Sequence, residues 1–471
     1  MNRRRFIKTV SASIPAISIL PYLTSCSLSN KRQPNIVLIL ADDLGYGDLS
    51  CYGQTHFATP NIDKLAKEGM MFTQHYAGSP VCAPSRCVLM TGKHTGHSYV
   101  RGNMQAVPSG QLPLPASETT FAKILQANGY ATGCFGKWGL GIAGSSGDPL
   151  NHGFDVFFGY HDQVLAHNSY PEYLYKNREK VYLDNEVQYV SKDHWSKGLG
   201  SVSSMKKEYS NDLIFEQAMN FMEANVDNPF FLYFPTTIPH DNGEAPRGER
   251  FEVPENEQFA DKEWSDEEKA YASLVVKLDD YVGELEKKLE ELNIADNTVF
   301  IFTSDNGALN PDNFENRFKS NGKLRGYKRD VYEGGIRVPL IVKWPGVVEP
   351  GSKSGHISGF QDYLTTVCDI AGIEHPETED GISFMPTLVN SEQAAHTSLY
   401  WEFHWWKPSI RAMRLGKWKA VQMDPGENIE LYDLDTDIEE RFDVSTENPE
   451  ILSKMRVMLD KARTPSEHWS W

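Results

Sequence analysis

The sequence predicts an α/β protein whose core is a large mixed, mostly parallel sheet sandwiched by helices. The first observation is the apolar run at residues 35–41, which is typical of a strand buried on both faces of a helix-covered sheet. Similar runs recur later in the chain, at residues 131–135, 229–235, 298–303 and 340–345. The second observation is that helical stretches separate these runs. In the clearest of them, residues 265–292, apolar side chains keep a 3.6-residue spacing.

The other elements of the larger part of the chain are predicted in order. Residues 59–69 are expected to be helical, because Thr59 suits the N-cap and Pro60 the first helical position. Residues 70–76 are expected to form a strand, and residues 243–264 a long irregular insertion at the rim of a pocket. Further helices are predicted at residues 117–128, 211–226 and 358–371.

The composition of the chain changes after residues 372–376. Four short segments then favour an antiparallel meander, at residues 398–403, 410–414, 418–423 and 429–433. A terminal helix is predicted at residues 449–462. We therefore expect a larger domain at residues 35–372 and a smaller C-terminal subdomain at residues 373–471.

Composition and charge exclude some classes of function. The chain has 471 residues, of which 40% are hydrophobic and 23% charged, as in ordinary soluble proteins. A formal net charge of −18, with no basic block after the N-terminus, argues against a nucleic-acid partner. An anionic substrate remains compatible with this balance, because a local basic pocket can lie in an acidic protein.

The N-terminus is expected to be a targeting segment. Residues 2–8 resemble a twin-arginine export signal, and the apolar stretch that follows is too short and too interrupted by prolines to span a bilayer. Residues 23–26 resemble a lipoprotein cleavage box, so Cys26 would carry the lipid of an exported periplasmic or outer-membrane-anchored protein of a Gram-negative bacterium. The alternative is an ordinary cleaved signal with an incidental cysteine. We expect residues 1–26 to be the signal and residues 27–34 a tether.

The remaining cysteines do not form a disulfide framework. Without Cys26 their number is odd and their spacing is not that of a zinc site; they are Cys51, Cys82, Cys87, Cys134 and Cys368.

Polar side chains follow the predicted buried strands where each strand ends. The adjacent carboxylates Asp42 and Asp43 follow the first strand, and Asp305 and Asn306 follow another. Because open α/β sheets bind ligands at the carboxyl ends of their strands, we expect these groups to meet. Irregular all-oxygen ligand sets suit a hard cation such as calcium, and no histidine at ligand spacing suggests zinc. In isolation, the same residues would also suit turns and helix caps.

The segment at residues 79–92 carries a candidate nucleophile. Pro84 suits the first position of a helix, so Cys82 should lie at or just before a helix N-terminus, where free N–H groups stabilise anions. Arg86 lies one turn further on and presents a fork that fits an oxyanion. Together these groups predict a site for phosphate-like or sulfate-like groups, although a lone cysteine is more often a buried packing residue.

Cys82, Pro84, Ser85 and Arg86, followed by Thr91 and Gly92, resemble the signature of the type I formylglycine-dependent sulfatases. The resemblance runs from about residue 35 to the C-terminus and implies the alkaline-phosphatase-like superfold of that family. It implies that Cys82 is oxidised by a maturing enzyme to formylglycine (3-oxoalanine), whose hydrate attacks sulfur. It also implies a calcium site made by Asp42, Asp43, Asp305, Asn306 and the modified Cys82.

The resemblance assigns the other catalytic residues as well. Arg86, Lys137 and Lys328 would compensate the charge of the sulfate, and His240 would protonate the departing oxygen. Lys137 stands in residues 136–141, where the family pattern has a histidine at the position of Gly139. In the family this histidine is thought to help the bound sulfate leave, so its absence puts the assignment of that step in doubt. His167 could supply an imidazole from a neighbouring loop instead.

The substrate is expected to be a sulfated glycan, because the chain resembles bacterial sulfatases of galactose-type sugars at Gly139, at residues 166–168 and at residues 96–103. A 4-O-sulfate on galactose or N-acetylgalactosamine is the predicted substrate. The residues that could contact the sugar are Arg101, Asn103, His167, Glu402, His404 and the aromatic residues Trp401, Trp405 and Trp406.

Two alternatives remain open from the sequence. One is a phosphoester or phosphonate hydrolase of the same superfold, although phosphatases of that superfold typically use two zinc ions with several histidines. The other is a catalytically silent glycan-binding lipoprotein. The expected partners are a sulfated saccharide and the maturing enzyme, with no nucleic acid and with membrane contact only through the lipid anchor.

Overall fold

The computed structural model describes residues 33–104, 111–190, 200–254, 257–309, 317–377, 380–404 and 409–471. The predicted export signal with Cys26, and the aromatic residues Trp405 and Trp406, lie outside the described residues. Residues 33–471 form one compact unit, and the predicted division of this unit at residue 372 stays a prediction.

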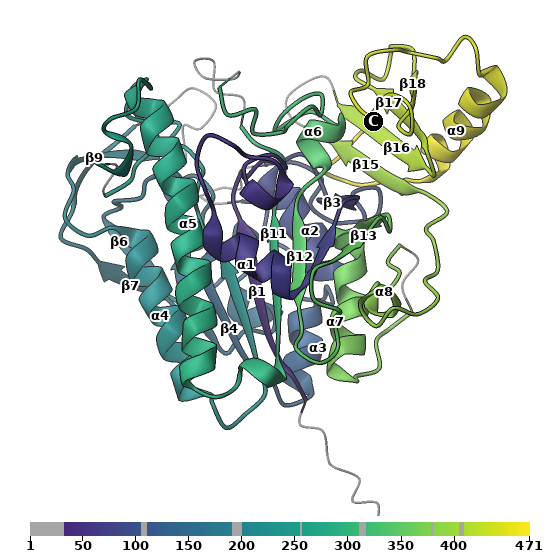
Figure 1. Ribbon diagram of the computed structural model, residues 1–471. Helices are drawn as coiled ribbons and strands as arrows, with labels where there is room; N and C mark the ends of the chain where they lie inside the picture. The colour runs from purple at the N-terminus through teal and green to yellow at the C-terminus, as the bar shows by residue number, and fades with distance from the viewer. Residues whose placement is uncertain are drawn as a thin grey trace, which may run out of the picture. The chain divides into compact units, whose positions relative to one another are not determined.

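The apolar runs form the centre of a ten-stranded sheet, as predicted. Five neighbouring strands of this sheet, β11, β1, β10, β4 and β5, are parallel, and β12, β6 and β7 run antiparallel to their neighbours (Figure 1). In spatial order the strands are β13 (Ser352–Ser354), β2 (Met70–Phe72), β12 (Leu340–Lys343), β11 (Thr298–Ser304), β1 (Asn35–Ala41), β10 (Phe230–Pro235), β4 (Ala131–Lys137), β5 (Val156–Tyr160), β6 (Tyr173–Lys176) and β7 (Glu179–Tyr182).

Helices cover both faces of the sheet because the central strands are apolar on both sides. Every residue of β1 is buried; Val37 and Ile39 face one core, and Ile36 and Leu38 face the other. The first core is shared with α1 (Pro60–Glu68), α4 (Ser210–Ala224) and α5 (Asp266–Glu291). The second is shared with α2 (Cys82–Thr91), α3 (Phe121–Ala127) and α7 (Tyr363–Ala371).

Helix α5 illustrates how the local sequence sets the bounds of an element. The Ser265 hydroxyl accepts the Glu268 N–H at 3.2 Å, and the Glu268 carboxylate accepts the Ser265 N–H at 2.6 Å. This capping box starts the helix at the position that its apolar spacing predicts. Within the described residues, no helix combines the length and the apolar character needed to cross a bilayer.

Several sequence-based bounds were wrong. Residues 70–76 form two strands in different sheets, because β3 (His75–Tyr76) leaves the main sheet to pair with β14 (Ser358–Gly359). The helix predicted from residue 358 therefore begins later, after this strand and a 3-10 turn. Strands β5 and β6, the edge strand β7, the separate pair β8 (Glu186–Tyr189) and β9 (Ser201–Met205), and the short helices α6 (Glu333–Ile336) and α8 (Met385–Leu388) were not predicted.

Short 3-10 helices complete the described elements. They comprise Ser50–Tyr52, Pro149–His152, Leu165–His167, Glu257–Phe259, Ala295–Asn297 and Phe360–Asp362. The segment at residues 243–264 is irregular apart from one such turn, as predicted, and the five described cysteines are free thiols.

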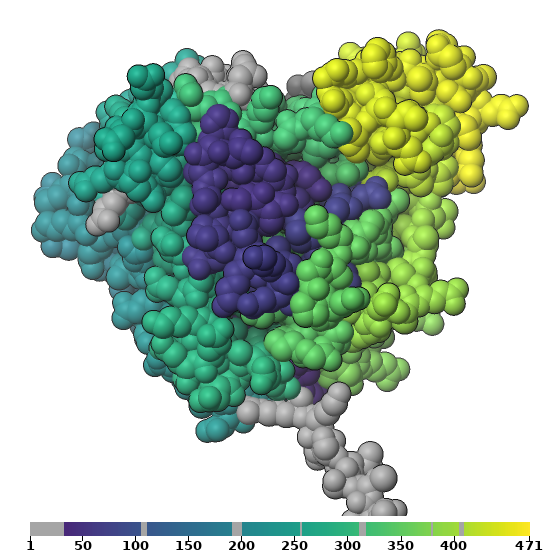
Figure 2. Space-filling view, in the orientation of Figure 1, coloured from purple at the N-terminus to yellow at the C-terminus, as the bar shows by residue number. Residues whose placement is uncertain are grey.

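The predicted C-terminal meander is a four-stranded antiparallel sheet of β15 (Leu399–Phe403), β16 (Ile410–Leu415), β17 (Trp418–Gln422) and β18 (Glu430–Asp433). One face packs on α9 (Pro449–Lys461), and the other packs against a cluster that includes Cys82 and Tyr76. Figure 2 shows these C-terminal residues, in yellow, gathered at one corner of the described unit. The small sheet therefore supports the start of helix α2 from outside the main sheet.

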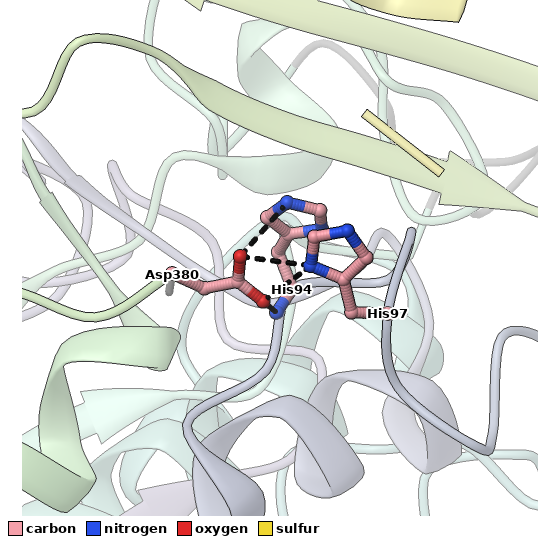
Figure 3. A group of neighbouring side chains, drawn as sticks. All are labelled: His94, His97 and Asp380. Atoms are coloured by element: carbon pink, nitrogen blue, oxygen red, sulfur yellow. Dashed lines mark hydrogen bonds and ion pairs between the residues drawn. The ribbon is translucent and has the colours of Figure 1, made fainter. Parts of the chain in front are cut away.

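A histidine–aspartate cluster ties the loop after α2 to the segment that leads into the C-terminal sheet. Figure 3 shows His94 and His97 both turned toward Asp380, whose carboxylate lies 3.2 Å from His94 Nε2 and 2.9 Å from His97 Nδ1. The Gly96 N–H donates to His94 Nδ1 at 3.1 Å, which places the His94 proton on Nε2. A proton on Nε2 donates to Asp380 and leaves no lone pair for a metal ion, so we interpret this cluster as a hydrogen-bonded tie.

We predict that His94 makes the fold acid-sensitive. Burial lowers the pKa of His94 to about 4, so the folded protein keeps this imidazole neutral while the unfolded chain protonates it below about pH 6.5. Because the unfolded state then binds more protons, this group costs stability as the pH falls from 6.5 to 4, by up to about 3 kcal/mol. The free energy of unfolding of His94→Gln, measured with urea across this range, should fall less steeply than that of the wild type; equal slopes would refute the assignment.

Candidate active site

Cys82 is the first residue of helix α2 and is 3% exposed. The preceding Val81 is extended and offers no side-chain cap, so the first N–H groups of the helix remain available to an anion at Cys82. The sequence predicted Pro84 at the first helical position, but Pro84 is the third residue of α2. Proline costs no hydrogen bond there, because the N–H groups of the first turn lack intrahelical partners. The Asn103 amide, predicted to contact sugar, lies beside the nucleophile, with Nδ2 3.8 Å from Sγ.

The predicted acidic residues meet at the ends of the neighbouring parallel strands β1 and β11. The Asp43 N–H donates to Asp305 Oδ1 at 3.2 Å, and the Asn306 amide donates to Asp43 Oδ1 at 2.7 Å. Ligand atoms of Asp42, Asp305 and Cys82 all lie within 4.8 Å of one another. The four oxygen-bearing side chains are almost completely buried, at 0–1% exposure.

Two cations from other elements compensate this acidic cluster. Lys137, the last residue of β4, places Nζ 2.7 Å from Asp42 Oδ2. Arg86, one turn into α2, donates from Nη2 to Asp305 Oδ2 at 2.8 Å and from Nε to the same oxygen at 3.1 Å. Its Nη1 donates to the carbonyl of Lys137. The arginine thus joins the nucleophile helix to the ends of β4 and β11.

The third cation joins the acidic cluster to the predicted acid. Lys328 Nζ lies 2.8 Å from Asp43 Oδ2 and 2.8 Å from His240 Nε2. His240 Nδ1 lies 2.6 Å from the Asp241 carbonyl oxygen, so Nδ1 carries the proton and Nε2 accepts from the lysine. The structure therefore brings together all five predicted catalytic residues, Cys82, Arg86, Lys137, His240 and Lys328.

Charge compensation decides the protonation of these buried groups. Burial alone would raise the pKa of Asp42, but the surrounding positive charges, Lys137 first among them, hold it well below its usual range. Burial alone would lower the pKa of Lys328, but the Asp43 carboxylate raises the pKa of that lysine above its usual value. Burial and then the Asp42 charge raise the pKa of Asp305. Burial and Lys328 lower the pKa of His240 to about 3.

The acidic cluster fits a hard cation. Among the described residues, Asp42 Oδ1 and Asn306 Oδ1 are buried oxygens without a hydrogen-bond partner, a costly arrangement that a bound cation would relieve. Carboxylate and amide oxygens are the ligands that calcium prefers, and the residues that would hold it are those predicted. The structure also brings His240 to Asp42 and Asp43, which the spacing along the sequence could not reveal. Since Lys328 occupies the His240 Nε2 atom, the set remains one of oxygen ligands.

The loop histidine His167 lies directly against the predicted acid. Its ring stacks on that of His240, with centroids 4.9 Å apart and an interplanar angle of 14°. Glu244 Oε2 lies 2.9 Å from His167 Nδ1 and orients the imidazole. His167 therefore lies beside His240, and its part in the reaction stays a prediction.

Three predicted sugar contacts instead bond to one another. Arg101 donates to Glu402 Oε1 at 3.0 Å and to the carbonyl and hydroxyl of Thr464. His404 Nε2 lies 3.1 Å from the same Glu402 oxygen, and Arg463 donates to the second oxygen at 2.8 Å. This buried network holds the loop of Asn103 to the C-terminal segment, so a sugar-binding role for these residues stays a prediction. Trp401 is also buried and donates to the Ala77 carbonyl.

Sequence reasoning missed two polar residues near the site. Glu244, the partner of His167, lies in the irregular insertion, where no pattern marks individual residues. Gln163 follows β5, a strand that was not predicted, and its amide lies against Gly139. Like the predicted residues, Gln163 follows the end of a strand. Recognition of β5 in the sequence would therefore have been the signal that pointed to Gln163.

Comparison with known proteins agrees with this geometry. Residues 34–373 match the family model described as Sulfatase, and residues 325–464 match that described as N-sulphoglucosamine sulphohydrolase, C-terminal. An arylsulfatase of Hemicentrotus pulcherrimus is 33% identical over 82% of this chain and 67% of its own length. An N-acetylgalactosamine-6-O-sulfatase of Bacteroides thetaiotaomicron is 29% identical over 97% of this chain and all of its own.

Solved structures share the fold. The structure of Ps i-CgsB in complex with k-i-k-neocarrahexaose has a TM-score of 0.75 and 28% identity, covering 92% of this chain and 93% of that one. A structure described under metabolism of multiple glycosaminoglycans by Bacteroides thetaiotaomicron has a TM-score of 0.74 and 27% identity, covering 92% of this chain and all of that one. With a family model over more than half of its length and Cys82, the cations and the acidic cluster in one buried site, the chain belongs to the sulfatase family and is a sulfuric ester hydrolase.

Proposed function

We propose that this sulfatase removes an O-sulfate from a sulfated glycan of the galactose type. The observation that carries the proposal is the position of Cys82 at a helix start, beside an acidic cluster and within reach of Arg86. Formylglycine at position 82 would supply the attacking oxygen, and calcium would stabilise its negative charge. The names of the relatives support a saccharide substrate, because several act on sulfated N-acetylgalactosamine.

The residues of the chain then divide the work. Lys137 pairs with Asp42 and Lys328 with Asp43, and both lysines would hold the sulfate oxygens with Arg86. His240 presents Nε2 toward this group and accepts a hydrogen bond from Lys328 there, while Nδ1 donates to a carbonyl. Nε2 would have to take up a proton, for which Lys328 is the adjacent donor, before it donates that proton to the departing sugar oxygen. His167, held by Glu244, would serve the release of sulfate in place of the histidine that is absent at Gly139.

Two kinds of support point to different sulfated positions on the sugar. The segment at residues 96–103 favours 4-O-sulfate on galactose or N-acetylgalactosamine, and the names of the relatives favour 6-O-sulfate. The deciding assay is release of inorganic sulfate from both positional isomers.

We also propose maturation by a dedicated enzyme and export as a lipoprotein anchored at Cys26.

Replacement of the nucleophile should abolish activity. Cys82→Ala, produced beside a maturing enzyme, should release sulfate at least about a thousandfold more slowly than the wild type, because no attacking oxygen is formed. Cys87→Ala is the matched control, since Cys87 is a buried cysteine of the same helix. Activity retained in Cys82→Ala would exclude the formylglycine mechanism. A wild type that hydrolyses phosphate esters and no sulfate ester would favour the phosphoesterase alternative.

Calcium should stabilise the folded protein through the acidic cluster. At a calcium concentration about 100 times the Kd, the free energy of unfolding should rise by about 2.7 kcal/mol, measured as a higher Tm than in the chelator EGTA. Asp305→Asn should lose most of this rise. Asp148→Asn is the control, because that buried aspartate pairs with Arg178 instead, and it should keep the rise. An equal calcium effect in both variants would rule out the assigned ligands.

The loss of activity on replacing His240 should depend on the leaving group of the substrate. His240→Ala should slow hydrolysis of a sulfated sugar by about 10²- to 10⁴-fold, because an alkoxide leaving group needs a proton. The same variant should slow 4-nitrophenyl sulfate by less than about tenfold, because nitrophenolate leaves without one. Values of kcat/KM for the two substrates test this, and equal losses would show that His240 does not act as the acid.

A further inference from the structure

Gln163 lies between two parts of the active site. The parallel strands β4 and β5 end side by side at Lys137 and Tyr160, and the chains continue together, with the Gly139 N–H donating to the His161 carbonyl at 3.2 Å. Gln163 follows two residues later and precedes the 3-10 turn that ends at His167. It therefore stands between the segment of the sulfate-binding lysine and the histidine that stacks on the predicted acid.

The turn that carries Gln163 is fixed by its neighbour. Asp162 Oδ1 accepts the N–H groups of Val164 at 2.8 Å and Leu165 at 2.9 Å, and Asp162 is 1% exposed. Two hydrogen bonds to one oxygen leave the backbone of this turn little freedom. The Gln163 side chain is thus presented from a rigid base, as a binding group needs to be.

The Gln163 carboxamide has no partner in the described protein. The residue is 2% exposed, and both Nε2 and Oε1 are buried without a hydrogen bond. An amide buried in this way loses its hydrogen bonds to water without replacement, so a residue with an apolar side chain would suit a purely structural role better. Other unpartnered buried oxygens at the site belong to Asp42, Asn306 and Asn103, which are groups expected to meet a cation or substrate.

The same side chain explains why residue 139 is glycine. A Cβ added at Gly139 would lie 1.9 Å from Gln163 Nε2, and the backbone there has φ +76°, a conformation that side-chain-bearing residues rarely adopt. The carboxamide therefore occupies the space into which a side chain at 139 would project. Lys137, which holds Asp42, stands only two residues before this position.

We propose that Gln163 is a substrate-contacting residue that donates a hydrogen bond from Nε2 to an oxygen of the sulfate group. The proposal rests on the proposed function. A carboxamide suits the place because it adds a hydrogen-bond donor without adding charge. The three positive charges of Arg86, Lys137 and Lys328 therefore still balance those of the three carboxylates. Unlike an imidazole, it cannot carry a proton, so it binds sulfate and leaves proton transfer to the histidines.

The test compares two buried glutamines. Gln163→Met removes the polar atoms at similar volume and should leave Tm unchanged or higher, because no hydrogen bond of the protein is lost. Its kcat/KM should fall by about 10- to 100-fold on both a sulfated galactose and 4-nitrophenyl sulfate, and the inhibition constant of inorganic sulfate should rise by a similar factor. Gln54→Met is the control: the Gln54 amide donates to the carbonyls of Gly47 and Phe318, so this variant should lose Tm and keep its sulfate affinity.

Each outcome separates the inference from the proposed function. A wild type that hydrolyses neither substrate would overturn the proposed function. If the wild type is active and Gln163→Met has unchanged kcat/KM and sulfate inhibition, the inference is wrong. A loss confined to the sugar substrate would overturn the contact with sulfate, and a loss that accompanies a fall in Tm as large as that of Gln54→Met would show a structural role.

Discussion

The compensation of three buried carboxylates by three cations is the constraint on which the site depends. Asp42, Asp43 and Asp305 are at most 1% exposed, and each contacts its own cation within 2.8 Å. An uncompensated charge at this depth would cost several kcal/mol, so these ion pairs must form together with the fold. The cations come from helix α2, strand β4 and the loop before α6. The site therefore joins segments that are far apart in the sequence.

The parallel sheet explains why these groups can meet at all. Parallel strands deliver their carboxyl ends to one edge, where β1, β4, β10 and β11 each pass their following residues into the site. Helix α2 adds N–H groups and Cys82 at the same edge, and the C-terminal sheet packs against its start. A nucleophile near the helix start gains from the same positive field that attracts an anionic substrate. The small sheet thus packs directly against the start of the helix that carries Cys82.

Much of this arrangement was predictable because it is encoded locally. The buried strands are apolar on both faces, and helix α5 carries its own capping box. Most of the predicted catalytic residues stand at or after strand ends or in a short motif. Strands β6 and β7, at one end of the sheet, were not predictable, because strands that are partly exposed lack a continuous apolar run. The contacts of Arg101 were not predictable either, since its partners Glu402 and Thr464 are more than 300 residues away. Local sequence patterns predicted which residues meet in the buried site, but long-range packing decides which polar side chains bond to one another.

The pair Gly139 and Gln163 shows how a departure from a family motif can be understood physically. Taken alone, a glycine in place of a histidine suggests a lost function. In the fold, the glycine accommodates a carboxamide from the neighbouring parallel strand end, and its positive φ would disfavour most side chains even without that neighbour. The polar group at this place is therefore supplied from a different position in the chain. Because the carboxamide is neutral, it cannot carry a proton as the family histidine would. The neighbouring imidazoles are those of His240 and His167, which stack on each other, and Glu244 contacts His167.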